Sequence, residues 1–457
     1  MLFSSIPFLY YFLPCDILLY LIAPKRLKNP ALFLSSLVFY AWGEPRFVVI
    51  MLISVTVGYL SGLLLEKHRG NKLLLLISVA IPLAFLLYFK YADFFLANFA
   101  AVTGLSVPLL RVTLPIGISF YTFQIVSYQI DVYRGSRAQK NPINLGTFIA
   151  LFPQLIAGPI VRYVDIEKEL EDRTHSMELV TKGIRRFCVG LGKKIIIANT
   201  LATLAGIATE ASQPSVLFYW LSALAAALQI YFDFSGYSDM AIGLGHIFGF
   251  RFLENFNYPF ISRSVTEFWR RWHMSLGSWF RDYVYIPMGG NRVSKPRWIF
   301  NILTVWMLTG FWHGAEWTFI LWGLVFAVFL VLEKFLLAGF LQKHRILSHL
   351  YVALLTLVSF TIFNSGNIEG MAASLSAMFG GAGLPLISAE TVYYLKSYAV
   401  ILTIALIGST PLPKNIIKKI PEKARNLLEI GYVPAVLTVC SAFLVDGAFN
   451  PFLYFRF

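Results

Sequence analysis

The sequence is poor in charged residues. Asp, Glu, Lys and Arg make up 14% of its 457 residues, whereas 57% are hydrophobic. Soluble domains carry about 25% charged residues, so this chain has too little polar surface to cover a water-exposed globule of its length. Apolar stretches long enough to cross a bilayer recur from end to end, which also excludes a soluble domain with one membrane anchor.

Cysteine is also scarce. Cys15, Cys188 and Cys440 lie far apart, in or beside apolar stretches. This spacing fits neither a metal site nor a disulfide framework, and we interpret the three as small buried apolar side chains. The sequence contains no P-loop, zinc motif, G-x-S-x-G elbow or dinucleotide fingerprint. We therefore predict no bound metal.

The apolar stretches predict an all-α, polytopic membrane protein with about 11–13 transmembrane or re-entrant helices. The segment 145–161 contains Pro153, Gly158 and Pro159, and we interpret it as a re-entrant or interfacial piece. The predicted spans lie near residues 7–24, 30–43, 47–65, 73–89, 113–132, 195–210, 216–235, 299–312, 317–333, 350–366, 396–410 and 429–448.

The net charge of +14 is carried largely by short loops between these stretches. That is the positive-inside distribution of cytoplasmic loops, so we expect membrane lipids and no nucleic acid as partners. The basic clusters share one side of the membrane if the N-terminus is outside. An even number of spans then places the C-terminus outside, and the Gly- and Ser-rich segment 367–395 becomes an external loop.

His313 is the first candidate for chemistry because it lies between two apolar stretches. Ionisable groups at membrane depth are costly and usually face a cavity. One continuous helix would put Trp306, Gly310, His313 and Trp317 on one face, and Gly310 and Gly314 would leave open space beside the imidazole. A neutral imidazole can accept a proton from a hydroxyl or thiol. The alternative is a structural histidine bonded to a neighbouring helix.

Other polar groups have two interpretations each. His273, beside Arg270 and Arg271, either anchors an interfacial helix or takes part in catalysis or substrate contact. Asp233 and Asp239 either contact a polar substrate, directly or through other groups, or cap a break between two helices.

Three basic residues and the C-terminal tail complete the candidates. Arg270, Arg271 and Arg281 either meet the phosphates of a coenzyme on the inner side or only follow the positive-inside rule. The tail, residues 450–457, is nearly all aromatic. It is either an aromatic belt at the outer interface or places Tyr454, whose phenol needs a nearby base to carry a group transiently.

Five segments together resemble the bacterial membrane-bound O-acyltransferase (MBOAT) family, in the branch that acetylates alginate and peptidoglycan. The resemblance spans nearly the whole chain, and its specificity comes from the segments occurring in this order. They are residues 114–121, 152–160, 233–239, 269–273 and 310–314.

The resemblance implies a funnel through a ring of helices, with a catalytic histidine in its narrow waist. His313 matches that histidine, and His273 matches the family's second one. Trp269 and Trp312 lie in the same motifs and are candidates for contacts with the substrate or with the groups around it. The donor implied is acetyl-CoA, and the partner is an extracytoplasmic transferase of the SGNH type. Residues 452–457 fit an F-x-Y-x-x-F pattern, which makes Tyr454 a candidate acyl relay.

We therefore predict a bacterial inner-membrane O-acetyltransferase that moves an acetyl group outward to a cell-surface polysaccharide, alginate-like or peptidoglycan-type. A polytopic transporter and a D-alanyl or lipid acyltransferase of the same family are the alternatives. We predict a single transmembrane domain over residues 1–457, divided into N-terminal helices, catalytic core, C-terminal helices and external tail at 1–112, 113–366, 367–448 and 449–457.

Overall fold

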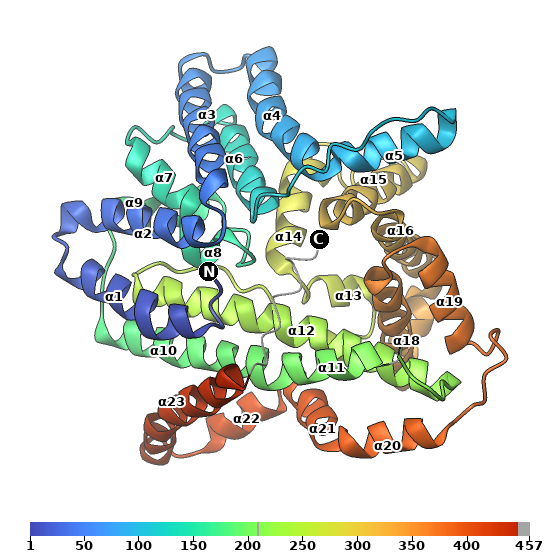
Figure 1. Cartoon of the computed structure of the whole chain (residues 1–457). Helices are drawn as coiled ribbons and strands as arrows, with labels where there is room; N and C mark the ends of the chain where they lie inside the picture. Colours follow the sequence, from blue (N-terminus) through green and yellow to red (C-terminus); the bar gives the residue numbers. More distant parts are fainter. Residues whose placement is uncertain (208–209, 447–457) are drawn as a thin grey trace. The chain divides into compact units, whose positions relative to one another are not determined.

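The structure is a computed structural model that describes residues 1–207 and 210–446, and these residues form helices and no strands. The all-α prediction is therefore confirmed (Figure 1). The chain divides into two units, residues 1–187 with 237–253 and residues 188–236 with 254–457. The predicted single domain and its subdivisions stay a prediction, as does the central funnel.

The first unit contains the N-terminal helices. Two longer helices, α10 (Met177–Gly192) and α12 (Val216–Ile247), belong partly to each unit. The remaining helices of the first unit are η1 (Phe8–Phe12), α1 (Leu13–Ile22), η2 (Lys25–Leu27), α2 (Lys28–Gly43), η3 (Pro45–Phe47), α3 (Val48–Lys67), α4 (Lys72–Leu86), η4 (Leu87–Tyr91), α5 (Ala92–Thr103), α6 (Ile118–Tyr133), α7 (Pro142–Ala150), α8 (Phe152–Leu155) and α9 (Tyr163–Glu171).

Small residues bring α3 against α6 in the first unit (Figure 1). A side chain at Gly58 would meet Ile125, and one at Gly62 would lie 2.5 Å from the Tyr128 hydroxyl. Helices in lipid associate through such close contacts because burial from lipid offers no hydrophobic gain. Because these two positions of α3 carry no side chain, α6 can pack closely against them.

The second unit contains the predicted catalytic region. Its helices are η5 (Lys193–Ala198), α11 (Asn199–Ile207), η6 (Pro259–Ile261), α13 (Val265–Trp269), α14 (Met274–Phe280), η7 (Arg281–Tyr285), α15 (Lys295–His313), α16 (Trp317–Leu332), η8 (Glu333–Leu337), α17 (Ala338–Lys343), α18 (Arg345–Asn364), α19 (Ile368–Met378), α20 (Ala389–Ser397), α21 (Ala399–Gly408), α22 (Leu412–Lys419) and α23 (Glu422–Val445).

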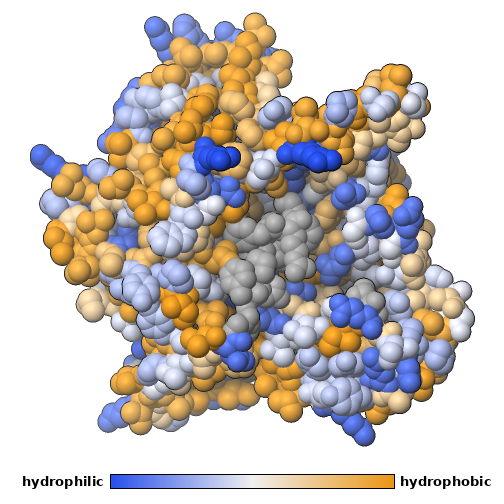
Figure 2. All heavy atoms as spheres, in the orientation of Figure 1, coloured by the Kyte–Doolittle hydropathy of each residue, from blue (hydrophilic) through white to orange (hydrophobic). Residues whose placement is uncertain are grey.

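Seven helices of the described residues are long and apolar enough to cross a membrane, or eight if the pair α20 and α21, bent by 59°, forms one span. Figure 2 shows hydrophobic side chains along α3 and α4 and hydrophilic ones at the turn that joins them. The prediction of a multi-pass membrane protein is therefore confirmed. The seven are Pro45–Lys67, Lys72–Thr103, Met177–Ile207, Val216–Ile247, Trp317–Lys343, Arg345–Asn364 and Glu422–Val445.

Three local expectations meet different outcomes. The segment 145–161 contains only the short helices α7 and α8, as expected for an interrupted apolar piece with Pro153. The segment 367–395 is not a plain loop but contains α19 and α20, which begin with side-chain caps from Asn367 and Ser388. Residues 233–239 lie inside the uninterrupted helix α12. The second interpretation of Asp233 and Asp239, as caps of a helix break, is therefore wrong.

Candidate active site

His313 is the last residue of α15, and its side chain is buried among aromatic rings of the second unit. Its ring centroid lies 5.1 Å from that of Trp312, 5.1 Å from that of Trp322 and 5.2 Å from that of Phe363. The chain leaves the helix through Gly314 in an extended conformation. The turn therefore places the imidazole at the end of a helix rather than along its side.

The glycines around His313 have a different role from the one expected. A Cβ at Gly310 would lie 2.2 Å from the carbonyl oxygen of Phe319, and one at Gly314 would lie 2.1 Å from the Phe319 ring. The space beside these glycines is therefore filled by α16. Trp317 begins the next helix, α16. It therefore does not share a helix face with Trp306 and His313, and that part of the prediction is wrong.

His273 precedes α14 and adopts the left-handed conformation, with φ 43° and ψ 52°. Its Nδ1 atom lies 3.1 Å from Oδ1 of Asn255. The same oxygen accepts hydrogen bonds from the backbone N–H and the hydroxyl of Ser275. Because a backbone N–H can only donate, this atom is the amide oxygen, and the Nδ1 of His273 must carry the proton.

The other nitrogen of His273 is the unusual group of the site. Nε2 is buried and has no hydrogen-bond partner among the described residues. Burial lowers the pKa of His273 to about 3, because desolvation disfavours the charged imidazolium. A neutral ring with a proton on Nδ1 offers its Nε2 lone pair as an acceptor.

The Trp312 ring packs against both histidines. Its ring centroid lies 6.1 Å from that of His273 and 5.1 Å from that of His313. Phe234 packs edge-on against His273 with a centroid distance of 4.6 Å. The structure thus brings together three predicted site residues and adds Phe234 and Asn255. No sequence pattern pointed to Asn255, since only folding brings it to His273.

Trp269 belongs to an adjoining aromatic cluster. Its ring lies 4.6 Å from that of Trp306, 5.6 Å from that of Trp322 and 4.9 Å from that of Phe326. Trp322 also contacts His313. Trp269 is therefore one ring removed from the imidazole, in a supporting position.

The two predicted aspartates are engaged in ion pairs. In the second unit, the buried Asp233 lies 2.5 Å from the ammonium of Lys194. In the first unit, Asp239 lies 2.8 Å from the guanidinium of Arg186. Both carboxylates therefore have charged partners from the α10–η5 segment, and their proposed contact with substrate stays a prediction.

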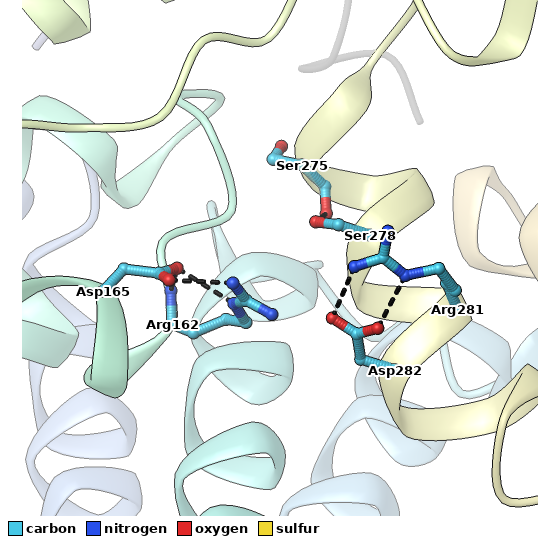
Figure 3. A network of polar contacts seen from close by, with 6 residues as sticks. All are labelled: Arg162, Asp165, Ser275, Ser278, Arg281 and Asp282. Carbon is cyan, nitrogen blue, oxygen red and sulfur yellow. Dashed lines mark hydrogen bonds and ion pairs between the residues drawn. The ribbon is translucent and has the colours of Figure 1, made fainter.

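The three arginines predicted to meet a coenzyme differ in their surroundings. Arg271 pairs with Glu267 at 2.9 Å, and Arg281 pairs with Asp282 at 2.7 Å (Figure 3). Arg270 is exposed and lines a cavity instead. In the first unit, Arg162 forms a comparable bidentate pair with Asp165 at the start of α9 (Figure 3). Tyr454 lies outside the described residues.

Comparison with known proteins decides the class of chemistry. A family model of the membrane-bound O-acyltransferases matches residues 49–365, a range that includes both histidines. This chain belongs to the MBOAT family. The predicted resemblance and the prediction of an acyltransferase are confirmed, and the transporter alternative has no support.

The relatives of this MBOAT chain include named transferases. A probable alginate O-acetylase of Azotobacter vinelandii is 43% identical over 389 residues, covering 83% of this chain and 78% of the relative. A peptidoglycan O-acetyltransferase of Helicobacter pylori is 32% identical, covering 84% and 81%. A teichoic acid D-alanyltransferase of Bacillus subtilis is 34% identical, covering 48% and 59%.

No group of three or more His, Cys, Asp or Glu side chains that could hold a metal ion occurs among the described residues.

Proposed function

We propose that this chain moves an acetyl group from cytoplasmic acetyl-CoA to an extracytoplasmic cell-surface polysaccharide, in the cytoplasmic membrane of a bacterium. The observation that carries the proposal is a pair of buried imidazoles in contact with one indole, that of Trp312. The names of the relatives favour an alginate-like or peptidoglycan-type acceptor.

The proposed reaction is acyl transfer with His313 as the general base. His313 takes the proton of an attacking hydroxyl, whose oxygen bonds to the carbonyl carbon of the thioester. The carbon–sulfur bond then breaks, and His313 returns the proton to the departing thiolate. A positioned base of this kind contributes about 100- to 10,000-fold to rate.

His273 has a complementary role in this proposal. Asn255 holds the proton on Nδ1, so the unpartnered Nε2 can accept a hydrogen bond but cannot donate one. It would accept a hydrogen bond from a donor group of the bound thioester or of the acceptor and so orient that molecule, while His313 takes the proton of the attacking hydroxyl. One imidazole thus positions a reactant, and the other activates the nucleophile.

The nucleophile is proposed to be the Tyr454 phenol, or a serine of an SGNH-type partner. Either route lets the small neutral acetyl group cross while the coenzyme stays inside and the polymer outside. The physical advantage is large, because moving the phosphates of the coenzyme into an apolar interior is strongly unfavourable.

The first experiment measures CoA release by the purified protein in proteoliposomes with acetyl-CoA and its acceptor system. We expect His313→Ala to lower the rate by at least about 100-fold. His68→Ala, which changes an exposed histidine after α3, is the matched control and should keep full activity. Undiminished release by His313→Ala would remove His313 from the mechanism.

The second experiment tests the relay by following transfer of labelled acetyl to polymer with Tyr454→Phe. This change removes the only phenol oxygen of the F-x-Y-x-x-F segment, so transfer to polymer should be lost. Tyr393→Phe removes the hydroxyl of an exposed tyrosine on α20 and should leave transfer intact. Equal transfer by both variants would exclude the relay and favour direct transfer to a partner serine.

The D-alanyl relative motivates a test of the donor. Acetyl-CoA, longer acyl-CoAs and a D-alanyl thioester should be compared at equal concentration. The proposal requires acetyl-CoA to give the highest rate, whereas a preference for the D-alanyl thioester would assign the chain to that chemistry.

A further inference from the structure

A cavity of about 540 Å³ lies in the second unit. Its wall contains neither His273 nor His313, and it has both cationic and apolar side chains. The wall includes the cationic side chains of Arg263, Arg270 and Lys334. It also includes the apolar side chains of Ile302, Leu330 and Leu341. A cavity of this kind suits a molecule with an anionic group at one end and hydrocarbon at the other.

The two carboxylates of the wall only partly offset these cations, because each is engaged by other groups. Glu333 is buried and accepts hydrogen bonds from the backbone at the start of α13 and from the Thr266 hydroxyl. Glu267 accepts the backbone N–H of Arg263 and pairs with Arg271. Both carboxylates therefore accept backbone hydrogen bonds at or just before the start of α13 and help to hold this helix in place.

Arg270 and Lys334 form no ion pair within the described part of the chain, whereas Arg263 shares the Glu267 carboxylate with Arg271. Lys334 is held in position by the Trp298 ring, with its Nζ atom 3.6 Å from the ring centroid. The Trp298 N–H donates to the Tyr285 hydroxyl at 2.9 Å, which fixes the ring. Three cationic side chains in the wall of one cavity favour a phosphate group.

The cavity also adjoins surface of the kind that faces lipid. Lys334 lies in the last third of the candidate span Trp317–Lys343, which ends at a second lysine. Beside it, Leu336 is 71% exposed and Phe340 is 46% exposed. Basic residues next to exposed apolar residues at the end of a span are typical of the membrane interface. A ligand could therefore enter from the bilayer.

We propose that this cavity binds an anionic phospholipid. The headgroup phosphate contacts Arg263, Arg270 and Lys334, and one acyl chain lies along Ile302 and Leu330. Basic pockets between membrane helices bind anionic lipid headgroups in this way. The site is separate from the proposed catalytic histidines, so its occupancy can be measured without any acyl transfer.

The test is native mass spectrometry of the purified full-length chain in detergent, titrated with phosphatidylglycerol or with phosphatidylcholine of the same chain length. We expect tighter binding of phosphatidylglycerol, weakened roughly tenfold or more in the double variant Arg263→Gln/Arg270→Gln. Arg251→Gln, which removes an exposed arginine of the first unit, is the matched control and should bind normally.

A second variant tests the apolar half without changing charge. Leu330→Trp should fill part of the cavity and weaken phosphatidylglycerol binding in a protein that still transfers acetyl groups. Equal binding of the two lipids, or unchanged binding in both cavity variants, would overturn the proposal. Displacement of the lipid by acetyl-CoA, with acetyl-CoA binding lost in the double arginine variant, would reassign the cavity to the phosphates of the coenzyme.

Discussion

His273 has a backbone conformation that non-glycine residues seldom adopt. Its positive φ of 43° costs roughly 1–3 kcal/mol, and such strain is concentrated at functional sites. The hydrogen bonds from Nδ1 and from Ser275 to Asn255 hold the residue there. This strained conformation lowers the stability of the fold, and it accompanies a buried imidazole whose Nε2 has no partner among the described residues.

We predict that Asn255→Ala destabilises the protein by about 1–3 kcal/mol, because it removes the acceptor of the buried Nδ1–H of His273. Acetyl transfer should fall as well, since the proton can then move to Nε2. Ser275→Ala removes one donor only and should cost less. Thermal unfolding in detergent and the rate of CoA release measure the two effects, and equal stability of Asn255→Ala and wild type would contradict the argument.

Two glycines decide how α15 and α16 pack. A Cβ at Gly310 would lie 2.2 Å from the Phe319 carbonyl oxygen, and one at Gly323 would lie 2.2 Å from the Trp306 carbonyl oxygen. Backbone atoms cannot yield as side chains do, so these contacts fix the distance between the helices. His313 on α15 and Trp322 on α16 meet because of them.

Gly310→Ala should therefore separate α15 from α16, at a cost of about 1–3 kcal/mol or more, and should lower activity through His313. Gly339→Ala on α17 places its methyl group in open space and serves as the control, with stability equal to or slightly above that of wild type. Melting temperatures of the two variants in the same detergent give the comparison. A Gly310→Ala protein as stable and active as the Gly339→Ala protein would refute the close-packing role.

The whole molecule has a predicted orientation that follows from charge. Basic clusters such as the one between α3 and α4 are expected inside, and the turn between α19 and α20 is expected outside. The structure supplies exposed positions for testing this at Arg69 and Ala382.

We predict that Ala382→Cys reacts with a membrane-impermeant thiol reagent added to intact spheroplasts, and that Arg69→Cys reacts only after lysis. The native Cys15, Cys188 and Cys440 are first replaced by alanine so that only the new thiol can react. The readout is the mass of the labelled protein. The opposite labelling pattern would invert the topology and place Tyr454 on the cytoplasmic side, which would end the relay proposal.

Composition and apolar runs determined that the chain is helical and crosses a membrane repeatedly, because every backbone polar group in lipid must be bonded within its own helix. Short motifs likewise pointed to the family and to His273 and His313. Only the tertiary structure decided that Gly310 closes a helix contact, that Asn255 sets the His273 tautomer and that Asp233 pairs with Lys194. These facts depend on which helices and loops pack against one another. Local patterns of hydrophobicity do not specify which side chains that packing brings together.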